Sequence, residues 1–149
     1  MKNYTYEETR RFIEELESGR NDIQTRLSGL REKRNSLKLW DVKGKKEIDN
    51  QIEDLTFNST CHSYSILMLQ MYEDSIRPKR GMMDTETLIK CEKEAESGDG
   101  MSKLIIFCHK CFIEHTIVER DLKRLEMEAS EGNYSSAYIL FGYNMFFAN

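Results

Sequence analysis

The chain has 149 residues, one proline, 32% charged residues and a formal net charge of −4. This length is enough for one domain with its own core, and the abundance of Glu, Lys, Leu, Arg and Met is typical of an ordered all-α protein and argues against disorder. The longest apolar runs fall well short of the roughly 20 residues needed to span a bilayer, so we expect no membrane partner.

The first half of the chain has the pattern of two long helices. Thr5 and Glu8 have the spacing of a capping box, and from there apolar residues recur every seven positions, which predicts a helix over residues 5–39. The apolar positions are Leu16, Ile23, Leu30 and Leu37, with Phe12, Ile13, Leu27 and Trp40 beside them. Residues 41–44 predict a tight turn, and a second helical arm follows over 45–75. We therefore expect an antiparallel helical hairpin.

Two stretches weaken this hairpin. Gly19 and Gly29 each cost a helix about 1 kcal/mol relative to alanine, so contacts between the arms must hold the first helix together. Residues 58–65 are mostly small and polar, and such side chains compete for backbone hydrogen bonds. They predict either a kink or a true break in the second arm.

Residues 26–46 hold eight basic side chains against Glu32 and Asp41, a local charge of +6. Such a segment can attract an anionic partner, either nucleic acid or an acidic protein face. A solvated helix face is the simpler interpretation, and we favour it because the chain as a whole is acidic. The candidate anion-binding residues are Arg26, Arg31, Lys33, Arg34, Lys38, Lys43, Lys45 and Lys46.

The second half of the chain contains one short pattern twice, 34 residues apart. Gly98 and Gly132 each follow a helical stretch, where glycine closes the last turn in the left-handed conformation. The next residues, Asp99 and Asn133, can cap a following helix. Each pattern therefore predicts a helix, a tight corner and another helix.

From these corners we expect a short helix-turn-helix repeat array. Residues 77–81 form a loop by composition, and Asp84 or Thr85 caps the helix that follows. The predicted helices cover residues 84–97, 100–115, 118–131 and 134–147. We divide the chain into a hairpin over 1–75 and a repeat region over 76–149 that packs on it as one structural unit.

Residues 64–149 resemble a Sel-one-like repeat, a relative of the tetratricopeptide repeat. Ala137, Phe141 and Gly142 match the first helix of that family's pattern, with Met145 in place of its aromatic residue. The segments 94–99 and 128–133 match the segment that closes each repeat. The resemblance implies an interaction scaffold and carries over no catalytic residue.

Cys108, Cys111 and His115 are the strongest candidates for a metal site, since zinc binds thiolates and imidazoles. A fourth ligand would come from Cys91 or from Cys61 and His62. We favour core packing, because the neighbouring residues are apolar and free cysteines are usually buried. We expect reduced thiols, and with no recognisable leader sequence, a cytoplasmic protein.

The last predicted helix is almost entirely apolar or aromatic. Its side chains either complete the core against the hairpin or leave an apolar face for a partner or a second copy of the chain. The candidate protein-binding residues are Tyr134, Tyr138, Tyr143, Phe146 and Phe147.

The sequence contains no phosphate loop, nucleophile elbow or other catalytic motif, so we expect no enzyme and no cofactor. The leading hypothesis is a protein–protein interaction module that acts as an adaptor or as an inhibitor that occludes its target, with self-association possible. The alternative is a nucleic-acid-associated factor that uses residues 26–46.

Overall fold

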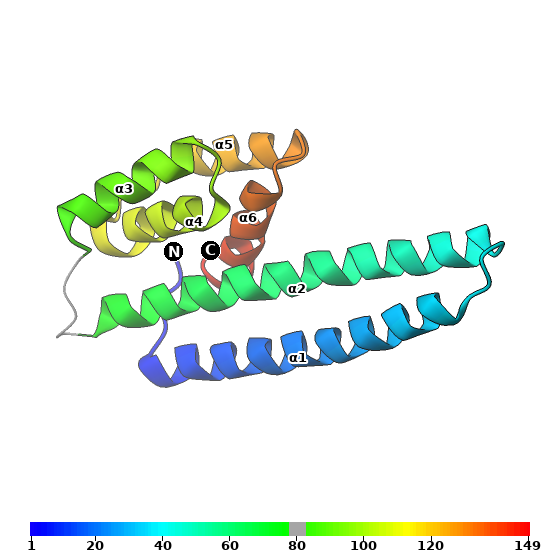
Figure 1. The fold of residues 1–149 in the computed structure, drawn as a ribbon. Helices are drawn as coiled ribbons and strands as arrows, with labels where there is room; N and C mark the ends of the chain where they lie inside the picture. The colour runs from blue at the N-terminus through cyan, green and yellow to red at the C-terminus, as the bar shows by residue number, and fades with distance from the viewer. Residues whose placement is uncertain (78–82) are drawn as a thin grey trace.

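The computed structural model describes residues 1–77 and 83–149, and within these ranges the protein is all-α, as predicted, with no strand (Figure 1). The elements in chain order are α1 (Tyr6–Ser36), α2 (Val42–Ile76), α3 (Thr85–Glu96), α4 (Gly100–His109), the π-helical turn η1 (Lys110–Glu114), α5 (Glu119–Ser130) and α6 (Tyr134–Phe146). No helix in the described ranges has the combined length and apolarity required to cross a membrane.

Helices α1 and α2 form the predicted antiparallel hairpin. The capping box that starts α1 is confirmed: Thr5 Oγ1 accepts from the Glu8 amide at 3.1 Å, and the Glu8 carboxylate accepts from the Thr5 amide at 2.8 Å. Four side-chain contacts set the register, and in each the two residue numbers add up to 83, as expected for two antiparallel helices in constant register. The pairs are Arg10 with Glu73, Arg20 with Ser63, Gln24 with Ser59, and Arg34 with Asp49.

Helix α2 continues through residues 58–65 without a break. Four residues of this polar stretch are buried, including Cys61 and Tyr64, so their packing stabilises a helix that their propensity alone would not. Ser63 satisfies its hydroxyl by donating to the Ser59 carbonyl one turn earlier, at 3.2 Å.

The turn of the hairpin lies earlier than predicted. Helix α1 ends at Ser36, residues 37–41 form the connection, and Gly44 lies inside the first turn of α2. The reason is Asp41, whose carboxylate caps α2 by accepting from the Gly44 amide at 2.9 Å. Trp40, expected on the apolar face of the first helix, is instead exposed in the connection.

Both predicted corners are confirmed. Gly98 and Gly132 have φ angles of +100° and +94°. At each corner the glycine amide and the next amide donate back to the preceding helix, which is the Schellman arrangement. Asp99 then caps α4 by accepting from the Ser102 amide at 2.9 Å, and Asn133 caps α6 in the same way at 3.1 Å.

The two corners place α3–α4 and α5–α6 as two helix pairs on the hairpin. Helices α4 and α6 lie against α2, while α3 and α5 form the outer layer (Figure 1). Asp84, rather than Thr85, caps α3 by accepting from the Thr87 amide at 2.8 Å. Residues 78–81 of the predicted loop lie outside the described residues.

The helix predicted over 100–115 changes its winding near its end. It is α-helical up to His109 and π-helical over Lys110–Glu114, and it ends at His115, whose φ is +54°. A π turn accommodates one extra residue, and here it is the turn in which Cys111 and Phe112 are both buried in the core.

One apolar cluster joins the hairpin to α4, η1, α5 and α6. It includes Ile13 of α1, Leu69 of α2, Leu104 of α4 and Ile139 of α6, all fully buried. A second, smaller cluster lies farther along the hairpin and consists of Ile23, Leu27 and Leu55, with Leu30 and Ile52 packed against it. The distal part of the hairpin is therefore held together by its own two helices.

Candidate binding groove

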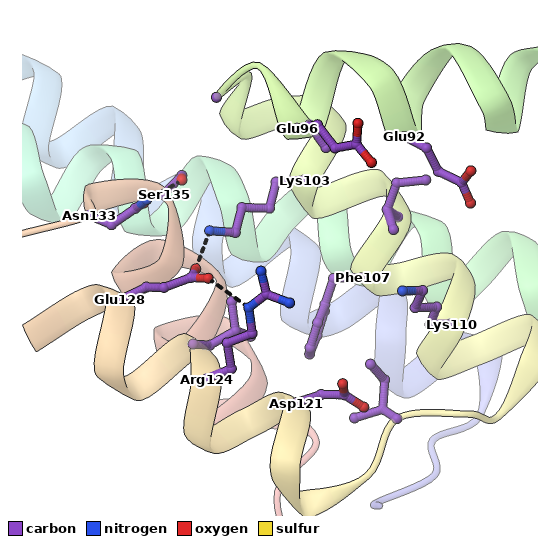
Figure 2. Close-up of a pocket in the computed structure, with 15 residues that line it drawn as sticks. Glu92, Glu96, Lys103, Phe107, Lys110, Asp121, Arg124, Glu128, Asn133 and Ser135 are labelled. Atoms are coloured by element: carbon purple, nitrogen blue, oxygen red, sulfur yellow. Dashed lines mark hydrogen bonds and ion pairs between the residues drawn. The ribbon is translucent and has the colours of Figure 1, made fainter. Parts of the chain in front are cut away.

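A groove of about 730 Å³ lies over α4, between α3 and α5 (Figure 2). The two outer helices stand apart, so α4 is left open to solvent between them. The groove is lined by Glu92, Ala95, Glu96 and Gly98 on the α3 side, by Lys103, Ile106, Phe107 and Lys110 along its floor, by Ile117, Asp121, Arg124, Leu125 and Glu128 on the α5 side, and by Asn133 and Ser135 at one end.

Three residues of the floor come from one helical face. Lys103, Phe107 and Lys110 are spaced by four and three residues, which places them in a row along the helix. The Phe107 ring is buried and packs edge-on against Tyr143 of α6, with 5.7 Å between ring centroids. The floor therefore has a rigid aromatic base between two lysines.

A hydrogen-bonded cluster links the floor of the groove to its α5 wall. Lys103 Nζ lies 2.5 Å from Glu128 Oε2 and 2.6 Å from Ser136 Oγ, and Ser136 Oγ donates to Glu128 at 2.7 Å. Arg124 Nε also donates to Glu128, at 3.2 Å, and Figure 2 shows both cations directed at this carboxylate. Burial raises the pKa of Glu128, but these hydrogen bonds and the Lys103 charge outweigh it, so its pKa lies below the usual value.

The first helix pair contains part of the same arrangement. Ser102 Oγ donates to Glu94 Oε2 at 2.9 Å, and both residues lie 34 positions before Ser136 and Glu128. Lys103 corresponds at this spacing to Ala137 and has no counterpart in the second pair. Lys103 thus adds a polar contact between the two helix pairs that the repeated pattern does not contain.

Sequence reasoning missed this groove. The segment 104–113 is strongly apolar and indicates a core helix, which is correct for its face toward α2. The available signal is that Lys103, just before this segment, and Lys110, within it, share one helix face with Phe107 at helical spacing.

The aromatic residues expected to bind a partner are only partly accessible. Tyr143, Phe146 and Phe147 are buried, so three of the five candidates belong to the core. Tyr134 is exposed and Tyr138 half-buried, and together with Phe57 they line a second hollow of about 390 Å³ whose rim carries Glu53 and Asp54. The last helix therefore packs on the hairpin, and of the five candidates only Tyr134 and Tyr138, in its first turns, reach solvent.

The eight basic candidates lie along the distal part of the hairpin, away from the groove (Figure 1). Arg34 is engaged by Asp49, with Nε and Oδ1 2.5 Å apart, and this hydrogen bond raises the pKa of Arg34. The other seven are Arg26, Arg31, Lys33, Lys38, Lys43, Lys45 and Lys46; of these only Lys45 is half-buried.

The cysteines are core residues in this fold. All four are unpaired and buried, and burial raises the pKa of Cys61 to about 11 and that of Cys111 to about 12. His115 is exposed beyond the end of η1 while Cys108 and Cys111 point into the core. Among the described residues no group of three His, Cys, Asp or Glu side chains is arranged to hold a metal ion.

The histidines lie in three different surroundings. His62 Nδ1 is 2.7 Å from the Asn58 carbonyl, His109 is buried with Nδ1 3.2 Å from the Glu114 carboxylate, and His115 is exposed. In the part of the chain that the structure describes, none of them forms a hydrogen bond to a serine, threonine or cysteine that could act as a nucleophile.

Comparisons with known protein families, with curated proteins and with solved structures find no match to this chain. The resemblance to Sel-one-like repeats therefore stays a prediction. What the protein does has to be inferred from its own geometry.

Proposed function

We propose that this protein is a non-catalytic interaction module and that the groove between α3 and α5 binds a segment of another protein. The observation that carries this proposal is the groove itself, an open channel with an apolar base and charged walls. Its volume of about 730 Å³ lies within the range of ligand sites in proteins. The matching corners support the same proposal, because stacked helix pairs commonly present such a channel to partners.

The charges of the groove indicate what kind of segment would fit. Glu92 and Glu96 project from the α3 side, whereas Lys110 and Arg124 lie on the floor and the α5 side (Figure 2). A segment with basic residues toward Glu92 and Glu96 and acidic residues toward Lys110 and Arg124 would complement these charges. An apolar residue between them would contact Phe107 and Leu125.

The proposal covers an adaptor, which uses the groove to bring a partner to another protein, and an inhibitor, which covers a functional surface of its target. The four free cysteines support a reducing compartment such as the cytoplasm as the place of action. Nucleic-acid binding through residues 26–46 has less support, because Arg34 is paired with Asp49 and exposed aliphatic side chains share that end of the hairpin.

The test is selection of peptides from a displayed library against the protein, followed by affinity measurements with two charge-matched variants. Lys110→Glu/Arg124→Glu reverses two charges in the groove, and Lys90→Glu/Lys123→Glu reverses two exposed charges outside it. We expect the groove variant to bind the selected peptides about tenfold more weakly or worse, and the control to bind them as the wild type does. Equal binding by all three proteins would disprove the proposed site.

A further inference from the structure

The tip of the α1–α2 hairpin combines exposed apolar side chains with a high density of basic ones. Leu39, Trp40 and Val42 are 88%, 75% and 71% exposed, the largest values among the exposed large apolar residues of the described chain. Residues 33–46 carry six basic side chains and one acidic side chain, Asp41, whose carboxylate caps α2. Lys38 Nζ lies 5.2 Å from the centre of the Trp40 ring.

The tip is far from the rest of the molecule. Figure 1 shows the hairpin extending beyond α5 and α6, with residues 37–41 at its free end. The small cluster of Ile23, Leu27 and Leu55 holds the two helices together on the way there. The tip is thus a convex end on a two-helix arm, and no described residue of the chain covers its apolar side chains.

We propose that this tip docks on an anionic lipid surface. Transfer of Leu39 and Val42 out of water lowers the free energy, and a lipid interface accepts these side chains without a preformed cavity. Tryptophan is enriched at the headgroup level of membranes, where its ring is apolar and its N–H remains hydrated. Lys38 lies over the Trp40 ring, and Lys33 and the lysines at the start of α2 lie on the helix ends that adjoin the tip, where they attract anionic headgroups.

Lipid explains this combination better than the two other anionic partners. Nucleic acid would use the lysines and could stack on Trp40, but it offers little to exposed aliphatic side chains. An acidic protein would need a pocket shaped to a convex tip. The first acidic residues of α2 are Glu47 and Asp49, and both come after Lys43, Lys45 and Lys46 in the sequence. Asp49 is also paired with Arg34, so these carboxylates leave the tip with an excess of positive charge.

The proposal concerns binding at the surface of a bilayer and not a membrane span. The expectation of no membrane partner rests on the short apolar runs, and these bear only on spanning. The tip and the groove lie on different parts of the molecule, so either proposal can fail without the other.

Trp40 is the single tryptophan of the chain and reports directly on the tip. The full-length protein is mixed with vesicles of equimolar phosphatidylserine and phosphatidylcholine, or of phosphatidylcholine alone. We expect co-sedimentation, a blue shift of Trp40 emission and quenching by brominated acyl chains with the anionic vesicles only.

Two variants separate the contributions of charge and apolar contact. Lys43→Glu/Lys46→Glu reverses two tip charges and should lower partitioning onto the anionic vesicles about tenfold or more. Lys90→Glu/Lys123→Glu makes the same charge change elsewhere, and its partitioning should be at least several times stronger than that of the tip variant. Leu39→Ser/Val42→Ser keeps the reporter and the charge and should reduce the blue shift and the quenching. Circular dichroism checks that each variant is folded.

Three results would overturn the proposal. The first is equal partitioning of the two charge variants. The second is sedimentation with anionic vesicles without any blue shift or quenching of Trp40, which would show attraction without apolar contact. The third is the absence of vesicle binding. If the protein then binds a DNA or RNA oligonucleotide through the tip in a strongly salt-dependent way, the nucleic-acid alternative is favoured.

Discussion

Lys103 in α4 forms an ion pair with Glu128 in α5, and this contact joins the two helix pairs that lie on the hairpin. The side chains are 24% and 22% exposed, so neither charge is fully hydrated. Ser136 contacts both of them and completes the cluster. Removing one partner would leave the other charge partly desolvated at the edge of the groove.

The first prediction concerns this cluster. Glu128→Gln should destabilise the protein by about 1–3 kcal/mol at neutral pH, because Lys103 then loses its charged partner in a partly buried place. The pKa of Glu128 lies below its ordinary value of 4.5, so the carboxylate stabilises the folded state above that value and its contribution is lost as the pH falls further. Urea unfolding of both proteins at pH 7 and pH 3 measures the difference.

The difference between the two proteins should be smaller at pH 3 than at pH 7, because protonation of Glu128 removes the contribution that the variant lacks. Glu119→Gln, on an exposed pair with Lys123, is the control and should change stability by less than about 1 kcal/mol. A cost of Glu128→Gln that is the same at both pH values would contradict the role of its charge.

The second prediction tests the corners. Gly98→Ala and Gly132→Ala should each lower the free energy of unfolding by about 1–2 kcal/mol, because a Cβ atom is strained at φ angles of +100° and +94°. Beyond the two adjoining residues, no atom lies within 4 Å of the place that an added Cβ would take at either glycine, so the cost comes from the backbone and not from a clash.

Gly29→Ala is the matched control for both corners. Gly29 is exposed within α1, and an added Cβ meets no atom within 4 Å apart from the adjoining residues and the helix's own backbone, so the change should stabilise the protein by about 0.5–1 kcal/mol. Thermal unfolding of the three variants gives the signs. Stabilisation by Gly98→Ala or Gly132→Ala would rule out the left-handed corners.

The features that the sequence predicts well are local ones. A capping box needs only Thr5 and Glu8, and a corner needs only Gly98 with Asp99, so their geometry follows from residues within five positions of one another. The hairpin turn lies a few residues from its predicted place because the sequence pattern assigns both Asp41 and Gly44 to the turn, whereas Asp41 caps a helix that already contains Gly44.

The features that the sequence does not predict depend on contacts between distant segments. The burial of Phe146 and Phe147 depends on α2 and on the N-terminal segment, where Tyr4 packs against Phe147 with 5.8 Å between ring centroids. The groove exists because α3 and α5 lie apart on either side of α4. The residue pattern of a single helix does not predict the distance between two other helices. Trp40 belongs to the heptad face in the sequence, but α1 ends before it.

The third prediction concerns the packing of α6 on α2. A Cβ atom at Gly142 would lie 3.0 Å from Ser65 Oγ and 3.4 Å from the end of Met68, so the two helices approach each other closely there. Helix propensity alone would make Gly142→Ala stabilising by about 1 kcal/mol. We expect the opposite sign, a loss of about 1–3 kcal/mol, since the core is closely packed. Denaturant unfolding decides between them, and a stabilised variant would show that the helices are less close.

The fourth prediction concerns the thiols. Burial raises the pKa of Cys61 to about 11 and that of Cys111 to about 12, and it raises that of Cys108 as well. Because the thiolate is the reactive form, these three cysteines should react with a thiol reagent at pH 8 far more slowly in the folded protein than in urea. Mass spectrometry after timed labelling measures each site.

The labelling also distinguishes core cysteines from a functional thiol pair. If Cys108 and Cys111 are core residues, their protection should fall together as urea unfolds the protein, in parallel with the loss of helix seen by circular dichroism. Cys108→Ala and Cys111→Ala should then each lower stability, because a buried side chain is shortened in a closely packed region. Rapid labelling of either cysteine in the folded protein would show an accessible thiolate and would reopen a redox or metal-binding role for this pair.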